Sequence, residues 1–400
     1  MEEITVFTYS LSLSRREWAK VSQARWATGE LWSRLVKIHR FCRRRHWPWQ
    51  AEGQLKVHFK KRLPLHSQTV QGIIEKFCAT IDGVRTKRQN GDKTARYPHR
   101  LKRYFNPIFK GQALKIRDGN RLELPMGRGR EPLRMCLPGL PEGRIVQAEL
   151  GFGVLYLTAK KTVPDPQPAG TSGGAGLDVG VVHLGTVSDG EQTLAVSGRG
   201  LRSVKQGRAK AHGKLQKKLS RCQKGSRRWK KLKRAGYRIT GQTKNIARNA
   251  LHHAANQIVD FCQENRVSTL YTGDLGNINK NKRKKRSRRT NQEVGTWEFG
   301  LLQTYLRYKL ARHGIQLAPI SEAYTSQTCP ICGHRTRVAG RTYRCRRCGY
   351  TAHRDAVGAV NILNKGVHQG VIQPGILPAT ERVTYRRPVP VKGASRRSCA

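Results

Sequence analysis

The chain has 400 residues, and its 78 lysines and arginines against 25 aspartates and glutamates give a formal net charge of +53. A protein with this charge repels itself unless a polyanion neutralises it, which favours a nucleic acid as partner. No segment approaches the ~18 apolar residues of a transmembrane helix, and the first residues lack the basic region of a signal peptide. Apolar residues make up 37% of the chain, enough for two or three folded domains.

The N-terminal part mixes strands and basic helices. A strand is expected over 4–13, and helical spacing of apolar residues predicts a helix over 15–45 and another over 70–81. Several short strands follow between 113 and 161, separated by Gly and Pro turns. This order indicates a small β-barrel interrupted by a helical insert. Residues 164–174 (PDPQPAGTSGG) have the composition of a linker.

Strands and helices alternate in the C-terminal part, as in an α/β domain. The expected elements are a strand over 175–179, a hairpin over 182–196, a basic helical region over 209–264, a strand over 267–272, a helix over 299–313, a strand over 315–320 and a closing helix over 356–363. Residues 366–400 are rich in Pro, Gly and Arg without periodicity, so we predict a disordered tail.

Two cysteine pairs carry the strongest local signal. Cys329–Cys332 and Cys345–Cys348 are both Cys-x-x-Cys, each followed by glycine, with twelve residues between the pairs. Four thiolates make a closed, structural zinc site without an open position for catalysis. A disulfide is the alternative, but six further cysteines are scattered singly, which is typical of reduced thiols in a cytoplasm. His334 and His353 could also bind zinc, but four cysteines already fill its four coordination positions.

Carboxylates are scarce in the C-terminal half, where only eleven Asp and Glu lie between Pro164 and Asn361. Asp178 stands on the first strand, and Asp355 stands at the start of the last helix, where the helix dipole favours an anion. Acidic residues in so basic a background suit a pair of Mg²⁺ ions that activate water for phosphodiester cleavage. The plainer alternatives are a turn carboxylate for Asp178 and a helix N-cap for Asp355.

The motifs GLDVG, GDL, YTSQTCPICG, YRCRRCGY and HRDAVGAVNIL, between residues 175 and 363, resemble the catalytic half of the TnpB family and its small type V CRISPR relatives. The resemblance implies an RNase H-like (RuvC) domain split by a zinc ribbon, a wedge-like β-barrel and a helical recognition lobe. It also implies a guide RNA from the transposon end and cleavage of double-stranded DNA beside a short motif, with strand transfer left to a separate transposase. Base pairing between the guide RNA and the target DNA would then determine which DNA sequence is recognised.

This resemblance gives the expected domain boundaries. They are the wedge-like barrel at 1–14 and 100–163, the recognition lobe at 15–99, the linker at 164–174, the RuvC-like domain at 175–322 and 353–365, the zinc ribbon at 323–352 and the tail at 366–400.

One position departs from the family pattern. The catalytic Glu expected before Asp-Leu is replaced by Gly273. We predict that Glu322 fills the gap, because its strand should lie beside the strand that ends at Gly273. Asp274 is the nearer rival, although strand alternation points it to the other face. Glu298 is a further option at a helix start, and loss of nuclease activity is the remaining one.

Two basic segments are candidates for phosphate binding rather than plain solvated charge. Eight of the ten residues from Lys280 to Arg289 are cationic, and a second cluster surrounds Trp229. The candidates are Lys280, Lys282, Arg283, Lys284, Lys285, Arg286, Arg288, Arg289, Arg227, Arg228, Lys230 and Lys231.

The sequence therefore predicts an RNA-guided endonuclease of a bacterial or archaeal cytoplasm, associated with the nucleoid, that cleaves double-stranded DNA. Asp178, Glu322 and Asp355 would hold Mg²⁺ or Mn²⁺, and the four cysteines would hold Zn²⁺. Alternatives are a guided DNA-binding repressor without cleavage and, third, a transposase proper. Guide RNA and DNA are the expected partners.

Overall fold

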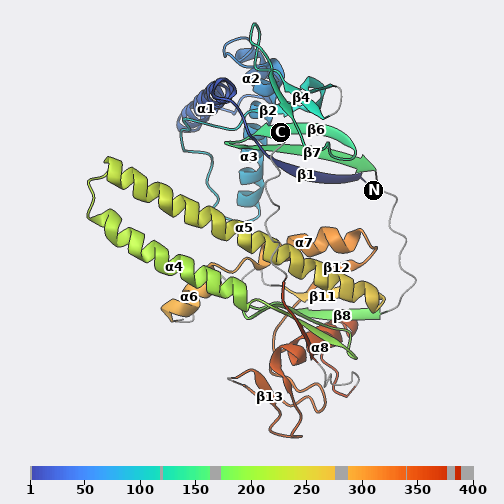
Figure 1. Cartoon of the computed structure of the whole chain (residues 1–400). Helices are drawn as coiled ribbons and strands as arrows, with labels where there is room; N and C mark the ends of the chain where they lie inside the picture. Colours follow the sequence, from blue (N-terminus) through green and yellow to red (C-terminus); the bar gives the residue numbers. More distant parts are fainter. Residues whose placement is uncertain are drawn as a thin grey trace. The chain divides into compact units, whose positions relative to one another are not determined.

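The computed structural model describes residues 2–117, 120–162, 173–274, 287–338, 340–375 and 383–388. The chain forms two compact units, Met1–Pro164 and Asp165–Ala400 (Figure 1). The division falls at the start of the expected linker, most of which lies outside the described residues. The linker prediction was wrong at its end, because Gly173 and Gly174 already belong to a strand.

The strands of the first unit form two antiparallel sheets. One has the order β1-β7-β6-β2 and the other the order β3-β4-β5. Their bounds are β1 Glu2–Ser10, β2 Ile108–Lys110, β3 Lys115–Arg117, β4 Arg121–Leu124, β5 Leu133–Cys136, β6 Arg144–Leu150 and β7 Val154–Thr162. In the described residues, these sheets are not paired into one closed barrel. The short 3₁₀ turn η1 (Gly111–Ala113) separates β2 from β3, and both sheets still share one apolar core.

Three helices complete the first unit: α1 (Arg15–Arg44), α2 (Glu52–His58) and α3 (Ser67–Gln89). Ser14 caps α1 through a capping box with Glu17, which satisfies free N–H groups at the helix start. The first half of α1 packs into the core of the strands, and its second half packs against α3 in a separate helical core. The expected helical insert therefore shares α1 with the sheets.

The second unit is built on a six-stranded mixed sheet of order β12-β11-β8-β9-β10-β15. Its strands are β8 Gly173–Asp178, β9 His183–Ser188, β10 Thr193–Ser197, β11 Val267–Gly273, β12 Gln316–Ile320 and β15 Val383–Arg386. β8, β11 and β12 are parallel, and Gly273 pairs with Ile320. The prediction that the strand over 315–320 lies beside the strand ending at Gly273 is confirmed.

Strand β15 corrects the prediction of a wholly disordered tail. It pairs in parallel with β10, whose outer edge would otherwise leave backbone groups unpaired. Val383-Thr-Tyr-Arg contains residues of high β-propensity, which suits it to this edge. The helix α8 (Arg354–Val367) also runs into the expected tail. Residues 376–382 and 389–400 lie outside the described residues.

Helices cover both faces of this sheet. On one face α8 lies so close to β8 that a Cβ on Gly176 would be 2.0 Å from the carbonyl oxygen of Ala359. Only glycine allows that approach. On the other face, Leu177 belongs to a core that includes Ile258 and Leu306 of two further helices. Side chains alternate along β8, so Asp178 lies on the same face as Gly176, toward α8.

The expected basic helical region is two helices, α4 (Arg199–Ser220) and α5 (Arg227–Glu264), which form a long hairpin (Figure 1). Gly225 adopts φ +90°, and Ser226 caps α5. The expected stripe on α5, from Ala247 to Phe261, is buried. Two shorter helices follow, α6 (Arg288–Gly295) and α7 (Phe299–Ala311). No helix within the described ranges is both long and apolar enough to cross a membrane.

Candidate metal centres and active site

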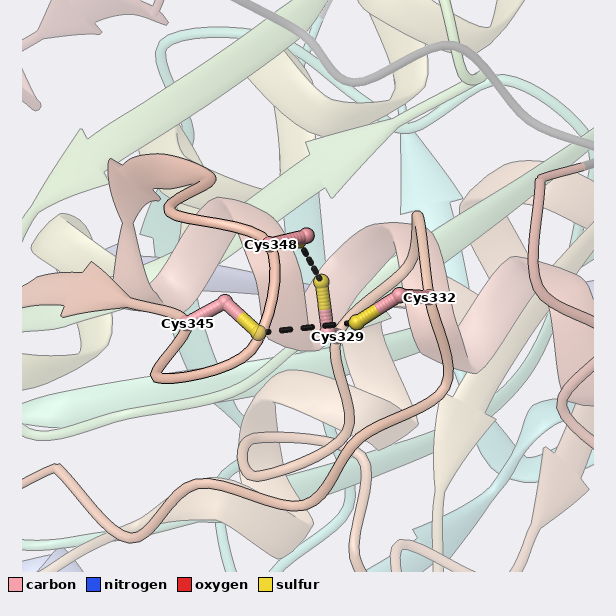
Figure 2. Close-up of side chains that lie close together, drawn as sticks. All are labelled: Cys329, Cys332, Cys345 and Cys348. Atoms are coloured by element: carbon pink, nitrogen blue, oxygen red, sulfur yellow. Dashed lines mark hydrogen bonds between the residues drawn. The ribbon is translucent and has the colours of Figure 1, made fainter.

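The four cysteines of the two Cys-x-x-Cys pairs converge, and dashed lines in Figure 2 join Cys329 with Cys348 and Cys332 with Cys345. Each pair sits in a tight turn. Gly333 and Gly349 adopt φ of +71° and +74°, and each donates its N–H to the carbonyl of the first cysteine of its pair. These left-handed positions explain why glycine follows each pair.

The spacing of the sulfurs fits a metal and not a disulfide. Cys329 Sγ lies 3.6 Å from Cys348 Sγ, and Cys332 Sγ lies 3.5 Å from Cys345 Sγ. A disulfide would bring two sulfurs to ~2.05 Å. Four sulfurs at ~2.3 Å from a tetrahedral zinc would lie roughly 3.8 Å apart. The cluster therefore suggests a structural zinc site.

The cysteine module connects directly to the last helix. Its hairpin consists of β13 (Thr342–Arg344) and β14 (Thr351–His353), and α8 begins at the next residue. Tyr343, Cys329 and Cys345 form a small core with Val357 of α8. Ordering this module therefore fixes the start of α8, where Asp355 lies.

Asp178 is the last residue of β8, so the alternative of a turn carboxylate is wrong. Its carboxylate lies against α8, because a Cβ on Gly358 would be 2.9 Å from Asp178 Oδ2. Gly358 is almost one turn after Asp355 in the same helix. The glycine thus leaves room for a carboxylate between the strand and the helix.

Glu322 lies directly over Gly273. A Cβ built on Gly273 would come within 1.6 Å of Glu322 Oε1 and 2.1 Å of its Cγ. The Glu322 side chain therefore occupies the space where a side chain at position 273 would begin. Gly273 follows Thr272, which pairs with Leu177, so the Glu322 carboxylate lies next to the strand end that carries Asp178. Its Oε1 atom is buried without a hydrogen-bond partner among the described residues.

Asp355 is held from two sides. His183 Nδ1 donates to Asp355 Oδ2 at 2.8 Å, and Arg341 Nη1 lies 3.0 and 2.8 Å from its two oxygens. Asp355 is in the first turn of α8, but the N-cap is His353, whose Nδ1 accepts the N–H of Asp355 at 3.3 Å. The plain N-cap alternative for Asp355 is therefore wrong.

The electrostatics of the three carboxylates differ. Burial, with the neighbouring charges of Asp355 and Glu322, raises the pKa of Asp178 to about 8. Burial and then the charge of Asp274 raise the pKa of Glu322 to about 6. Burial also opposes the charge on Asp355, but the His183 hydrogen bond and the Arg341 charge outweigh it, so the pKa of Asp355 is lowered. The site concentrates negative charge that a cation would relieve.

The two rivals of Glu322 have different surroundings. Glu298 precedes α7 and lies 3.5 Å from Lys205, and it is not among the charged groups that shift the pKa of Asp178. Asp274 donates its N–H to Ile320, and its charge acts on Glu322. Asp274 is therefore close to Glu322, although Gly273 is the residue whose side-chain position Glu322 fills.

Sequence reasoning missed His183 and Arg341, and it considered His353 only as a spare zinc ligand. His183 lies on β9, and Arg341 lies just before β13. Neither stands in a short motif with Asp355, so only the fold brings them together. Of these three residues, only His353 could have been noticed in the sequence, because it begins the motif HRDAVGAVNIL and lies close to Asp355 in it.

The basic candidates divide into two groups. Lys280, Lys282, Arg283, Lys284, Lys285 and Arg286 lie outside the described residues, and Arg288 and Arg289 begin α6. Arg227, Arg228, Lys230 and Lys231 are exposed in the first turns of α5, near the tip of the α4–α5 hairpin. Within the described parts of the chain these four make no ion pair.

Two family models match this chain. One, described as "Probable transposase", matches residues 157–279, and the other, described as "Cas12f1-like, TNB domain", matches residues 299–362. The second match spans α7, the cysteine module and most of α8.

Whole-protein relatives agree with these matches. The chain is 30% identical over 289 residues to the "Putative RNA-guided DNA endonuclease InsQ" of Escherichia coli K12, covering 68% of this chain and 69% of that protein. It is 29% identical over 301 residues to a "Putative RNA-guided DNA endonuclease" of Streptomyces pristinaespiralis, covering 72% and 69%.

Solved structures share the fold. A cryo-EM structure of a Cas12f1-sgRNA-target DNA complex matches with a TM-score of 0.62 at 15% identity, covering 88% of this chain and 82% of that one. The mini-RNA-guided endonuclease CRISPR-Cas_phi3 matches with a TM-score of 0.56 at 11% identity, covering 94% and 93%. The mixed α/β fold with a four-cysteine module is therefore Cas12f-like.

Proposed function

This chain belongs to the TnpB family of RNA-guided DNA endonucleases, related to Cas12f, and on that basis we propose that it is a Mg²⁺-dependent nuclease with a relocated catalytic glutamate. It would use a guide RNA to select double-stranded DNA and would hydrolyse phosphodiester bonds at Asp178, Glu322 and Asp355. The six-stranded sheet with α8 would be its RNase H-like (RuvC) domain, interrupted by the zinc ribbon. The first unit would supply the wedge-like and recognition parts.

The observation that carries the proposal is the position of Glu322 over Gly273. Family members place a glutamate at the end of the strand equivalent to β11. In this chain the glutamate side chain at that place comes from the segment after β12, the adjacent parallel strand. Carboxyl ends of parallel strands meet at one edge of a sheet, so a carboxylate from either strand can reach the same point.

The donor set fits hard divalent cations. Glu322 Oε1 is a buried acceptor with no hydrogen-bond partner among the described residues, and the pKa of Asp178 is raised by burial and by the neighbouring carboxylates. Both features indicate missing positive charge. Mg²⁺ or Mn²⁺ bound by Asp178, Glu322 and Asp355 would supply activation of water and stabilisation of the leaving oxygen.

The remaining residues would position the carboxylates. Arg341 and His183 keep Asp355 ionised and fix its orientation at the start of α8. Gly358 lets the Asp178 carboxylate approach the helix, and Gly273 leaves the space that Glu322 fills. The exposed cations at the start of α5 would contact nucleic-acid phosphates without reading sequence.

Substitution of Glu322 tests the proposal. Glu322→Ala should lower the rate of guided, Mg²⁺-dependent DNA cleavage by at least about a thousandfold, because a lost metal ligand removes several kcal/mol of transition-state stabilisation. Guide-directed DNA binding should persist, measured by mobility shift with the copurified or reconstituted guide RNA. Asp274→Ala is the matched control and should cost about tenfold or less in rate.

Other outcomes have definite meanings. If Asp274→Ala loses as much cleavage activity as is expected of Glu322→Ala, and Glu322→Ala itself stays active, Asp274 is the third metal-binding carboxylate. A parent protein that binds guided DNA but never cuts it with Mg²⁺ or Mn²⁺ would favour the nuclease-inactive repressor or targeting factor.

A further inference from the structure

Two histidines meet Asp355 from different parts of the fold. His183 lies on β9, His353 ends β14, and Asp355 is in the first turn of α8. One ligand atom from each residue lies within 4.8 Å of those of the other two. Apart from the four cysteines, this is the one such group of His, Cys, Asp and Glu found in the parts of the chain that the structure describes. The proposed carboxylate chemistry requires neither imidazole as a ligand.

The geometry is close to that of a bound ion. The His183 and His353 ring centroids are 5.2 Å apart at an interplanar angle of 62°, and a ring nitrogen of each lies within 4.8 Å of an Asp355 carboxylate oxygen. His183 is only 4% exposed, and His353 is partly buried. Ligand atoms at ~2.0–2.2 Å from a tetrahedral zinc lie roughly 3.4 Å apart. The 2.8 Å separation of His183 Nδ1 and Asp355 Oδ2 needs to open only slightly to admit an ion.

The donor chemistry selects the type of ion. Neutral imidazole is a good ligand for Zn²⁺, Co²⁺, Ni²⁺ and Cu²⁺, whereas Mg²⁺ prefers oxygen ligands. We propose that His183, His353 and Asp355 form a second metal site, separate from the four cysteines, for a divalent transition-metal ion such as Zn²⁺ or Co²⁺. Two nitrogens and one carboxylate oxygen leave a coordination position for water.

Arg341 does not block this site permanently. It contacts Asp355, but its side chain is 52% exposed, so the guanidinium can move into solvent when an ion takes its place. His353 accepts the Asp355 N–H only at 3.3 Å, a long hydrogen bond that costs little to give up. The simpler alternative is that the histidines only orient Asp355, and the test below distinguishes the two.

The site has a consequence for the proposed nuclease, because Asp355 belongs to both. An ion held by the two histidines would engage the carboxylate that Mg²⁺ needs, so Zn²⁺ at low concentration should inhibit Mg²⁺-supported cleavage. Only this consequence rests on the proposed function. Binding of the ion can be measured whether or not the protein cleaves DNA.

Cobalt binding tests the proposal on the full chain. The protein is first loaded with zinc at the four cysteines and freed of excess metal, and Co²⁺ is then titrated by calorimetry and visible absorption. We expect one additional Co²⁺ with a spectrum lacking the intense sulfur-to-cobalt absorption of thiolate ligation. His183→Gln and His353→Gln should each weaken this binding by at least about tenfold. His313→Gln, an exposed histidine of the same unit, is the matched control and should bind like the parent.

Two results would overturn the proposal: no Co²⁺ bound beyond the zinc of the four cysteines, or binding that both His183→Gln and His353→Gln leave unchanged. Circular dichroism of each variant shows whether the fold is retained. If His183→Gln unfolds the chain, the Co²⁺ affinity of His353→Gln alone decides whether the proposal holds, because the His353 ring is more exposed and its loss disturbs the core less. Inhibition is scored as the ratio of cleavage with and without Zn²⁺ in each protein. An inactive parent would contradict the proposed function and leave the binding result valid.

Discussion

The cysteine cluster lies between Glu322 and Asp355 along the chain, and it is assembled differently from the carboxylate site to which those two residues are assigned. All four thiols come from one short stretch, and each pair is shaped by its own turn and glycine. The carboxylates come from the end of β8, the segment after β12 and the start of α8. A local sequence can therefore build the first site, whereas the second exists only when the sheet and α8 are in place.

The two sites also differ in electrostatics before any ion binds. Burial raises the pKa of the Cys329 thiol to about 12. Burial also opposes the charge on Cys345, but hydrogen bonds from the N–H groups of Cys348 and Arg347 outweigh it and lower the pKa of Cys345 to about 6. The four thiols therefore need not all be charged at once, and they repel one another little before an ion binds. The carboxylates repel one another, and burial together with the neighbouring charges raises the pKa of Asp178 to about 8. A zinc ion would therefore add stability to the cysteine module, whereas the repulsion among the carboxylates lowers the stability of the fold until a cation relieves it.

The largest expected effect is the unfolding of the cysteine module when it cannot bind its metal. Structural zinc contributes apparent binding free energies of ~10–16 kcal/mol in small zinc domains. Cys345→Ser should therefore abolish zinc binding and unfold residues 323–352, measured by metal analysis and hydrogen exchange. Cys136→Ser, an exposed free cysteine of the first unit, should change neither. Full zinc content in Cys345→Ser would refute the four-thiolate assignment.

The next effect concerns the relocated glutamate. Gly273→Glu alone should abolish cleavage and destabilise the fold, because its Cβ would overlap Glu322. Combined with Glu322→Ala, the same substitution restores one carboxylate at this place. Cleavage by the double variant should return to within about a hundredfold of the parent, the cost of a ~1 Å misplacement.

A glutamate added elsewhere is the control for the double variant. Gly241 on α5 has open space around its Cβ position, so Gly241→Glu with Glu322→Ala should stay inactive. Recovery by both double variants would mean that added charge, and not its place, restores activity.

The smallest expected effect is a gain in stability. Burial and the charges of Asp355 and Glu322 raise the pKa of Asp178 to about 8, so near neutral pH folding must either protonate this carboxyl or leave a repelled charge. Asp178→Asn removes that cost. It should raise the free energy of unfolding by roughly 0.5–2 kcal/mol, as is common when strained active-site groups are neutralised. Denaturant titration without added Mg²⁺ measures it. Asp260→Asn, at an exposed position of α5, is the control and should change the free energy of unfolding by less than about 0.5 kcal/mol. If Asp178→Asn is less stable than the parent, the carboxylate at position 178 does not cost stability.

Much of the architecture was predictable from local patterns. Helical spacing located α1, α3 and α7, and alternation with turn residues located β9, β10, β11 and β12. The cysteine spacing identified the metal cluster, since its chemistry is encoded within twenty neighbouring residues. Short elements such as α2, β2 and β5 were missed, because a few residues carry too little periodicity. The strand β15 was missed because its order depends on pairing with β10.

The sequence by itself predicted a polyanion as partner, identified a four-cysteine module suited to a structural metal, and placed the chain with guided nucleases, because charge, thiol spacing and contiguous motifs are local properties. Only the tertiary structure decided which side chains surround Asp355 and what fills the space above Gly273. Arg341 reaches Asp355 across the short β13–β14 hairpin. His183 and Glu322 are far from their partners along the chain, and strand pairing together with the packing of α8 on β8 brings them together. Such contacts depend on the register of the whole sheet, which no short stretch of residues specifies.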